Sequence, residues 1–156
     1  MLEHIWPQIS YATGRPSRSF ITVQERKARA KAPGAECPSV LVVDDEVILA
    51  DSVAEILNIS GFCAFSAYDG STALRITEEL RPDYLLSDVM MPGMNGVDLA
   101  ITVRKMLPQT AILLISGTVV SDLIEDARER GYVFELLEKP MHPARLIERL
   151  KQIRPS

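Results

Sequence analysis

The chain has 156 residues, of which 47% are apolar and 24% are charged, a composition typical of one globular domain with room for an appendage. No apolar run reaches the roughly 18 residues of a membrane span, and the N-terminus lacks the short apolar core and cleavage site of a secretory signal. We therefore expect a cytoplasmic protein that makes no contact with a membrane.

Charge divides the chain into two parts. Residues 1–38 carry six basic and three acidic side chains, whereas residues 39–156 carry eleven basic and eighteen acidic ones. The contrast places a boundary near Pro38. Because residues 1–38 show no sustained hydrophobic period, we interpret them as a flexible extension, although residues 19–32 could instead form a short basic helix that docks or binds a partner. The acidic body disfavours direct binding of nucleic acid.

From Val40 onward, short apolar runs alternate with segments of helical period. The runs predict five strands, at residues 40–43, 62–67, 83–88, 111–116 and 134–139. The first, third and fourth are almost continuously apolar, as expected of strands that are covered on both faces. The segments between and after them predict five helices, at residues 46–60, 70–80, 95–107, 120–130 and 143–153.

Several residues mark where these helices start and stop. Gly61 follows the first helix, Asp69 or Ser71 can cap the second, and Pro143 suits the first turn of the last. The resulting βαβαβαβαβα order predicts a parallel sheet with right-handed crossovers and helices on both faces. The fold class is therefore α/β, a flavodoxin-like doubly wound five-stranded sheet of order 2-1-3-4-5 with five flanking helices.

The two cysteines, Cys37 and Cys63, form no CxxC or Cys/His group that would indicate zinc or a redox pair. We expect them to be unrelated, reduced thiols, one in the extension and one in a strand.

Polar side chains follow four of the five strands at the point where each strand ends. The sequence places Asp44, Asp45 and Glu46 after the first strand, Asp88 at the end of the third, Ser116 at the end of the fourth and Lys139 at the end of the fifth. Carboxyl ends of parallel strands share one edge, and neighbouring strands lie roughly 4.8 Å apart. These residues are therefore expected to meet where doubly wound folds bind their ligands.

The chemistry of this group predicts phosphoryl transfer. Carboxylates gathered at an apolar edge repel one another unless a cation lies among them, and oxygen ligands select Mg²⁺ or a similar hard ion. Lys139 adds an ammonium and Ser116 a hydroxyl, which suit the oxygens of a phosphoryl group. An aspartate can be the nucleophile that forms an aspartyl-phosphate. Each residue alone would be read as a helix cap, a turn residue or a surface lysine.

Residues 39–154 resemble the receiver domain of a two-component response regulator. The resemblance rests on VLVVDDE (40–46), SDVMMPGMNG (87–96), LLISG (113–117) and EKP (138–140). It implies that Asp88 accepts a phosphoryl group from a sensor histidine kinase or histidine phosphotransfer protein. The chain itself is then expected to have no enzymatic activity beyond autophosphorylation and autodephosphorylation. It also implies Mg²⁺ bound by Asp44, Asp45, Asp88 and the backbone carbonyl of Met90, Ser116 as the switch hydroxyl, Lys139 as the phosphoryl counter-ion, and a cis Lys139–Pro140 peptide.

Two positions depart from the family pattern. The family usually has an aromatic switch residue three positions before the lysine, and here that position is Leu136. Either Phe134, on the same face of the strand, replaces the aromatic, or the signal passes through Ser116 and residues 117–131 alone. Met90 cannot orient an attacking water by a hydrogen bond, which predicts a long-lived phosphoryl state. Met91 and Met94 are expected to be packing residues, since thioethers are soft ligands.

We expect a downstream protein to bind the face made by the helix at 120–130, the strand at 134–139 and the helix at 143–153, with a homodimer as one possibility. No segment is left for a DNA-binding output domain, which suggests a stand-alone receiver or a phosphorelay shuttle. Three alternatives remain. The first is a Mg²⁺-dependent phosphatase, but Met90 stands where such an enzyme needs an acid/base aspartate. The second is a degenerate receiver that only binds partners, and the third is a flavin-binding module, whose phosphate the acidic residues would repel.

Overall fold

The structure, a computed structural model, describes residues 37–153. The predicted extension lies outside the described residues except for Cys37 and Pro38, and so does the possible helix at 19–32. The chain folds into one five-stranded parallel sheet of order β2-β1-β3-β4-β5. The elements are β1 (Ser39–Val43), α2 (Val47–Ile59), β2 (Cys63–Ala67), α3 (Gly70–Leu80), β3 (Tyr84–Asp88), α4 (Gly96–Met106), β4 (Ala111–Ser116), α5 (Ser121–Glu129), β5 (Glu135–Glu138) and α6 (Pro143–Gln152).

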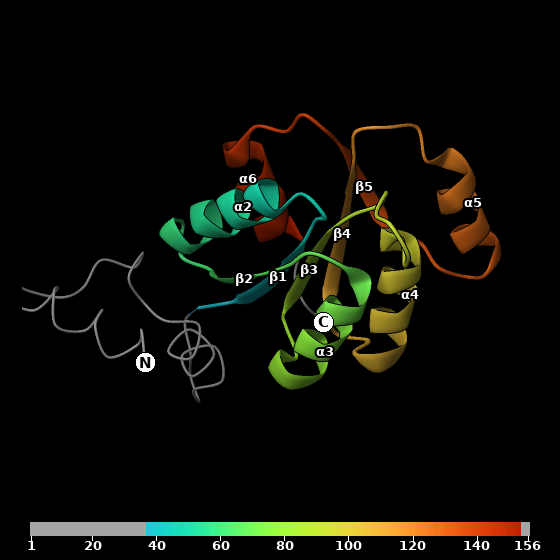
Figure 1. The fold of residues 1–156 in the computed structure, drawn as a ribbon, viewed down its shortest axis with the longest axis horizontal. Helices are drawn as coiled ribbons and strands as arrows, with labels where there is room; N and C mark the ends of the chain where they lie inside the picture. Colours follow the sequence, from blue (N-terminus) through green and yellow to red (C-terminus); the bar gives the residue numbers. More distant parts are fainter. Residues whose placement is uncertain (1–36, 154–156) are drawn as a thin grey trace, which may run out of the picture.

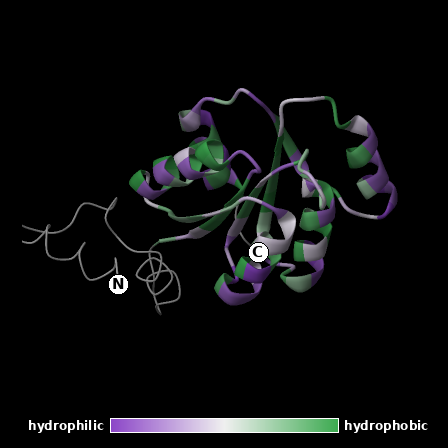
Figure 2. Ribbon diagram, viewed as in Figure 1, coloured by the Kyte–Doolittle hydropathy of each residue, from purple (hydrophilic) through white to green (hydrophobic). Residues whose placement is uncertain are grey.

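The helices cover both faces of this sheet, as Figure 1 shows. Alternate residues of each strand point to opposite faces, so Leu41 packs with α3, α4 and α5 while Val42 packs with α2 and α6. The strands are mostly apolar, with polar residues at several of their ends, and the helices carry both apolar and polar side chains (Figure 2). The predicted α/β fold class and strand order are confirmed.

The helix boundaries fall within one residue of the prediction, because the local residues that end and begin helices act as expected. Asp69, not Ser71, caps α3 by accepting a hydrogen bond from the Thr72 N–H at 2.7 Å. Gly61 has a positive φ of 104° just beyond α2, a conformation that glycine adopts without steric cost. None of the helices in residues 37–153 has the length and apolar character that crossing a membrane requires.

The prediction of two separate, reduced thiols is wrong. Cys37 and Cys63 form a disulfide, with their Cα atoms 5.5 Å apart. The cause is the register between β1 and β2, in which Ser39 pairs with Cys63, while the Cys63 N–H donates to the Pro38 carbonyl at 2.8 Å. Parallel pairing thus begins before the predicted start of the first strand. As a result, the last residues of the predicted extension lie beside β2.

Candidate functional site

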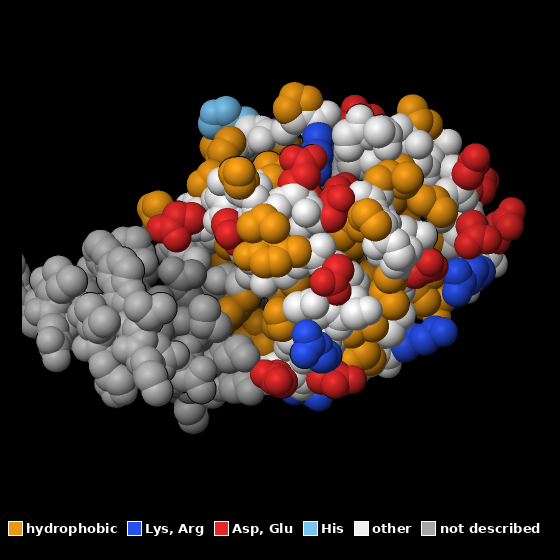
Figure 3. All heavy atoms as spheres, in the orientation of Figure 1, with side chains coloured by type: hydrophobic (Ala, Val, Ile, Leu, Met, Phe, Trp, Pro, Cys, Tyr) orange, Lys and Arg blue, Asp and Glu red, His pale blue; other side chains and the backbone are white. Residues whose placement is uncertain are grey.

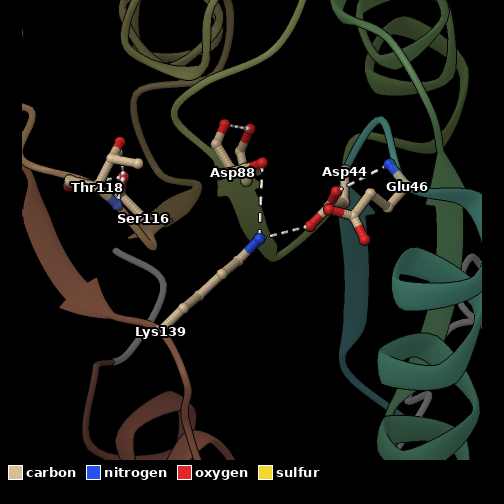
Figure 4. A network of polar contacts seen from close by, with 7 residues as sticks. Asp44, Glu46, Asp88, Ser116, Thr118 and Lys139 are labelled. Atoms are coloured by element: carbon tan, nitrogen blue, oxygen red, sulfur yellow. Dashed lines mark hydrogen bonds and ion pairs between the residues drawn. The ribbon is translucent and has the colours of Figure 1, made fainter.

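The polar residues that end the strands meet at the carboxyl edge of the sheet, as the topology predicts. The pairing of Asp88 with Ile115, and of Ser116 with Glu138, aligns the ends of β3, β4 and β5. The Asp44 N–H donates to the Ala67 carbonyl at 3.1 Å and so extends the ladder past β1. Residues from positions 44 to 139 therefore face one small volume (Figure 4).

Three carboxylates form the acidic part of this site. Asp44, Asp45 and Asp88 each present an oxygen within 4.8 Å of the others. Asp44 is buried, Asp88 is half-buried and Asp45 is exposed. Asp44 is also fixed by its own turn, since its Oδ1 accepts a hydrogen bond from the Glu46 N–H at 3.0 Å. An all-oxygen set of this kind suits a hard divalent cation.

Lys139 supplies the positive charge. Its side chain reaches across from the end of β5 (Figure 4), and its Nζ lies 2.9 Å from Asp44 Oδ2 and 3.6 Å from Asp88 Oδ2. The Lys139 N–H also donates to the Ser116 carbonyl at 2.9 Å, and the Lys139–Pro140 peptide is cis as expected. The ammonium thus bridges the two most buried acids.

Burial and charge shift the ionisation of both partners. Burial raises the pKa of the Asp88 carboxyl, the Lys139 ammonium opposes this, and the Asp44 and Asp45 carboxylates add to it, leaving the pKa above its ordinary value. Burial acts to lower the pKa of Lys139, but its hydrogen bond to Asp44 and the charges of Asp44 and Asp88 outweigh that effect and raise it. One ammonium therefore does not fully compensate the acids, which leaves the site complementary to further positive charge.

The backbone around Asp88 is held from both sides. Its carbonyl accepts a hydrogen bond from Ser87 Oγ at 2.9 Å, and the Val89 N–H donates to Ile115 at 3.0 Å. Gly96, at the start of α4, donates its N–H to Val89 at 2.8 Å. A Cβ at Gly96 would lie only 2.0 Å from the Asp88 carbonyl oxygen. The close approach of α4 behind Asp88 thus requires glycine.

Ser116 lies at the site, but its hydroxyl is engaged locally. Its Oγ donates to the Thr118 carbonyl at 3.1 Å and accepts a hydrogen bond from the Thr118 N–H at 3.2 Å. Figure 4 shows this pair on the far side of Asp88 from Asp44. For Ser116 to donate a hydrogen bond to a group on Asp88, its hydroxyl has to give up the bond that it donates to the Thr118 carbonyl.

The methionines near Asp88 differ in exposure. Met91 is 7% exposed and belongs to the core, and Met94 packs against the same core, so their predicted packing role is confirmed. Met90 is 53% exposed. The role of its carbonyl as a metal ligand stays a prediction.

Leu136, at the position of the missing switch aromatic, and Phe134, its possible replacement, lie at different heights of the sheet. Leu136 pairs with Leu114 inside β5, whereas Phe134 precedes the strand, at the opposite end from Lys139. Phe134 stacks on Tyr132, with ring centroids 6.2 Å apart, and carries the Arg104 guanidinium 5.7 Å above its ring. Phe134 does share the face of Leu136, but this placement argues against its replacing the missing aromatic.

Sequence reasoning missed Thr118 and Ser87 as partners within the site. Thr118 follows Ser116 at the short spacing of a hydroxyl turn, which is a signal that could have found it. Ser87 precedes Asp88 in the predicted strand, where its side chain would be expected to point away from that of Asp88. Its bond to the main chain of Asp88 had no signal in the sequence.

Comparison with known proteins shows the family of the chain. The family model described as response regulator receiver domain matches residues 40–151. The DNA-binding response regulator MtrA of Mycobacterium tuberculosis (strain ATCC 25618 / H37Rv) is 35% identical over 112 residues, which are 72% of this chain and 48% of MtrA. The chain thus spans about half the length of the curated relatives it matches.

Solved structures give the same result. The chemotaxis protein CheY4 of Vibrio cholerae has a TM-score of 0.68 at 28% identity, covering 75% of this chain and 98% of CheY4. NtrX of Brucella abortus, solved in complex with ATP, has a TM-score of 0.65 at 31% identity, covering 73% of this chain and 26% of NtrX.

Proposed function

Because the chain belongs to the family of response regulator receiver domains, whose members accept phosphoryl groups in two-component signalling, we propose that Asp88 is its phosphoacceptor. One observation carries this assignment. The Asp88 carboxylate lies 3.6 Å from the Lys139 ammonium and within 4.8 Å of an oxygen of each of two further carboxylates. A nucleophilic carboxylate, a fixed cation and a hard-metal ligand set are the parts that aspartyl phosphorylation needs.

We propose that Asp44, Asp45 and Asp88, with the Met90 carbonyl, would hold Mg²⁺. When bound, the ion would neutralise the charge that develops on the phosphoryl oxygens. A carboxylate oxygen of Asp88 would attack phosphorus as the bond from phosphorus to the donor breaks and the donor group leaves, while Lys139 pairs with one phosphoryl oxygen. Ser116 would exchange the hydrogen bond that it donates to the Thr118 carbonyl for one to another phosphoryl oxygen. The same site would support autophosphorylation from small donors and autodephosphorylation.

The phosphoryl donor in the cell is proposed to be the phosphohistidine of a sensor kinase or phosphotransfer protein, and the exchange is placed in the cytoplasm. Apolar side chains flank the site on two loops and on α2, and in Figure 3 apolar and acidic side chains adjoin on the visible face. The most exposed are Ile48 at 83% and Val119 at 91%. Such residues give a partner apolar contacts beside Asp88.

The output face is proposed to be α5, β5 and α6. β5 is an edge strand, and Ala127 is the one buried residue of α5, so this face can bind a downstream protein or a second copy of the chain. Release of Ser116 from Thr118 would move the segment that leads into α5, which is how phosphorylation would reach this face.

Incubation with acetyl phosphate and Mg²⁺, followed by intact-mass measurement, tests the phosphoacceptor. We expect one added phosphoryl group on the native chain and on Asp122→Asn, an exposed control on α5, and none on Asp88→Asn. Labelling of Asp88→Asn at the native level would refute the proposal. Rapid turnover of acetyl phosphate without a lasting adduct would favour a phosphatase instead.

A further inference from the structure

A cavity of about 530 Å³ lies beside the site, between α2, α6 and the sheet. Its walls come from three strands, both helices and the loop before α6, and they are mostly apolar, with Asp44, Asp88 and Lys139 at one corner. The main lining side chains are those of Leu49, Ala50, Val53, Leu86, Ile115 and Leu146. The phosphoryl site does not require this space, since it needs only the polar corner where Asp44, Asp88 and Lys139 lie.

The cavity has a buried floor and a partly open mouth. Ala50, Leu86 and Leu146 on the floor are 0–6% exposed, whereas Leu49 and Val53 at the mouth are half-buried. A concave apolar space of this depth lies within the roughly 300–1,000 Å³ that small-molecule sites occupy. A protein partner would bury a wide surface and place only a single side chain here.

We propose that this cavity binds a small hydrophobic molecule that carries one hydrogen-bond donor, such as a hydroxyl or an amine. The apolar walls fit the body of the molecule. The donor is required by the polar corner, where two carboxylates face one ammonium that already contacts both. Without a bound metal ion, the same carboxylates repel an anionic head group, so a carboxylate analogue of the same size should bind more weakly.

Binding here would be linked to phosphorylation, a consequence that rests on the proposed function. The Lys139 side chain lines the cavity while its Nζ contacts Asp44 and Asp88. A molecule that fixes Lys139 therefore changes the free energy of the phosphorylated state, and phosphorylation changes its affinity by the same factor.

The test titrates the full chain, labelled with ¹⁵N, with phenylethanol and with phenylacetate. These probes share a ring and a chain length but differ in charge. We expect phenylethanol to shift the amide resonances of Ala50, Leu86 and Leu146 until the shifts saturate. Phenylacetate should bind at least about tenfold more weakly, which corresponds to a difference in binding free energy of about 1.4 kcal/mol. Leu49→Trp, which fills the mouth, should lose binding, while Ile48→Trp, on the exposed side of the same helix, should keep it.

The proposal is overturned if no saturable shift occurs, if both probes bind alike, or if Leu49→Trp binds as well as Ile48→Trp. The proposal also fails if the Leu49→Trp substitution, without any added probe, shifts amides within residues 1–36. In that case the chain's own N-terminal extension would be the occupant of the cavity. The titration contains no phosphoryl donor, so its result is independent of whether Asp88 is phosphorylated. An affinity for phenylethanol that is the same before and after Asp88 is labelled by acetyl phosphate overturns the linkage.

Discussion

Lys139 makes its shorter contact with Asp44, at 2.9 Å, and its longer one with Asp88, at 3.6 Å. The ammonium thus occupies part of the acidic site in which we propose that Mg²⁺ binds. Metal binding and the Lys139–Asp44 contact draw on the same carboxylate, so the two cations compete for Asp44. Metal binding would free Lys139 to pair with a phosphoryl group on Asp88.

This competition predicts opposite effects of Lys139→Met on two measurements. Mg²⁺ should bind more tightly, by several-fold in calorimetry, because the acids lose a competing cation while the apolar stem is kept. Labelling by acetyl phosphate should slow by about tenfold or more, because the phosphoryl oxygens lose their counter-ion. Lys151→Met, an exposed site on α6, should change neither. Weaker Mg²⁺ binding by Lys139→Met would contradict the competition.

Gly96→Ala tests the close approach of α4 to Asp88. In most helices alanine is more favourable than glycine by about 1 kcal/mol, but here its Cβ would lie 2.0 Å from the Asp88 carbonyl oxygen. We expect the clash to reverse the sign and lower the free energy of unfolding in urea by about 1–3 kcal/mol. Gly117→Ala, whose Cβ would lie an ordinary 3.6 Å from Lys139, is the control. Equal or greater stability of Gly96→Ala would show that α4 shifts at little cost.

Met90→Asn tests whether the side chain beside Asp88 limits hydrolysis of the phosphoryl group. Met90 is exposed, and its thioether is a weak acceptor that cannot hold a water, whereas an amide can. The phosphorylated native chain should therefore outlive Met90→Asn by several-fold, as followed by loss of the phosphoryl mass. Met90→Leu, which is also apolar, should match the native chain. A native half-life no longer than that of Met90→Asn would rule out this role.

The sequence predicts the sheet and the meeting of Asp44, Asp88, Ser116 and Lys139 because both depend on periodicity and topology. Apolar runs of strand length fix the elements, and parallel strands place their carboxyl ends at one edge. What it does not predict is which carboxylate Lys139 prefers, because the choice between Asp44 and Asp88 depends on a difference of less than 1 Å.

Two further features are invisible to pattern reasoning for a similar reason. The Cys37–Cys63 bond depends on the register of β1 against β2 one residue before the predicted strand. The cavity depends on how far α2 and α6 stand apart above Leu86, and an apolar stripe on each helix is compatible with either a filled or an open space.

Asp69→Ala tests the cap of α3 and its pH dependence. The backbone hydrogen bond from Thr72 is the main reason that the pKa of Asp69 lies below its ordinary value. A depressed pKa means that the charged form is stabilised by folding, so this stabilisation is present above the ordinary carboxyl pKa of about 4 and is lost as pH falls through the lower, folded value.

At neutral pH, Asp69→Ala should therefore cost about 1 kcal/mol, and the difference from the native chain in thermal unfolding should shrink as the solution is acidified below about pH 4. Asp69→Asn keeps an acceptor without a titratable charge, so it should lose little stability. A deficit of Asp69→Ala that stays constant down to the acid limit of folding would exclude the contribution of charge.

Cys37→Ser tests the disulfide and the compartment together. The bond closes a loop of 26 residues around β1 and α2, and removing such a cross-link should lower the free energy of unfolding by about 3 kcal/mol under oxidising conditions. With excess dithiothreitol, the native chain and the variant should unfold at the same temperature. Disulfides are rare in the cytoplasm, so alkylation of free thiols at the moment of lysis distinguishes the two settings. If Cys37 and Cys63 both resist alkylation, the disulfide exists in the cell. If both thiols are alkylated, the disulfide forms only after oxidation.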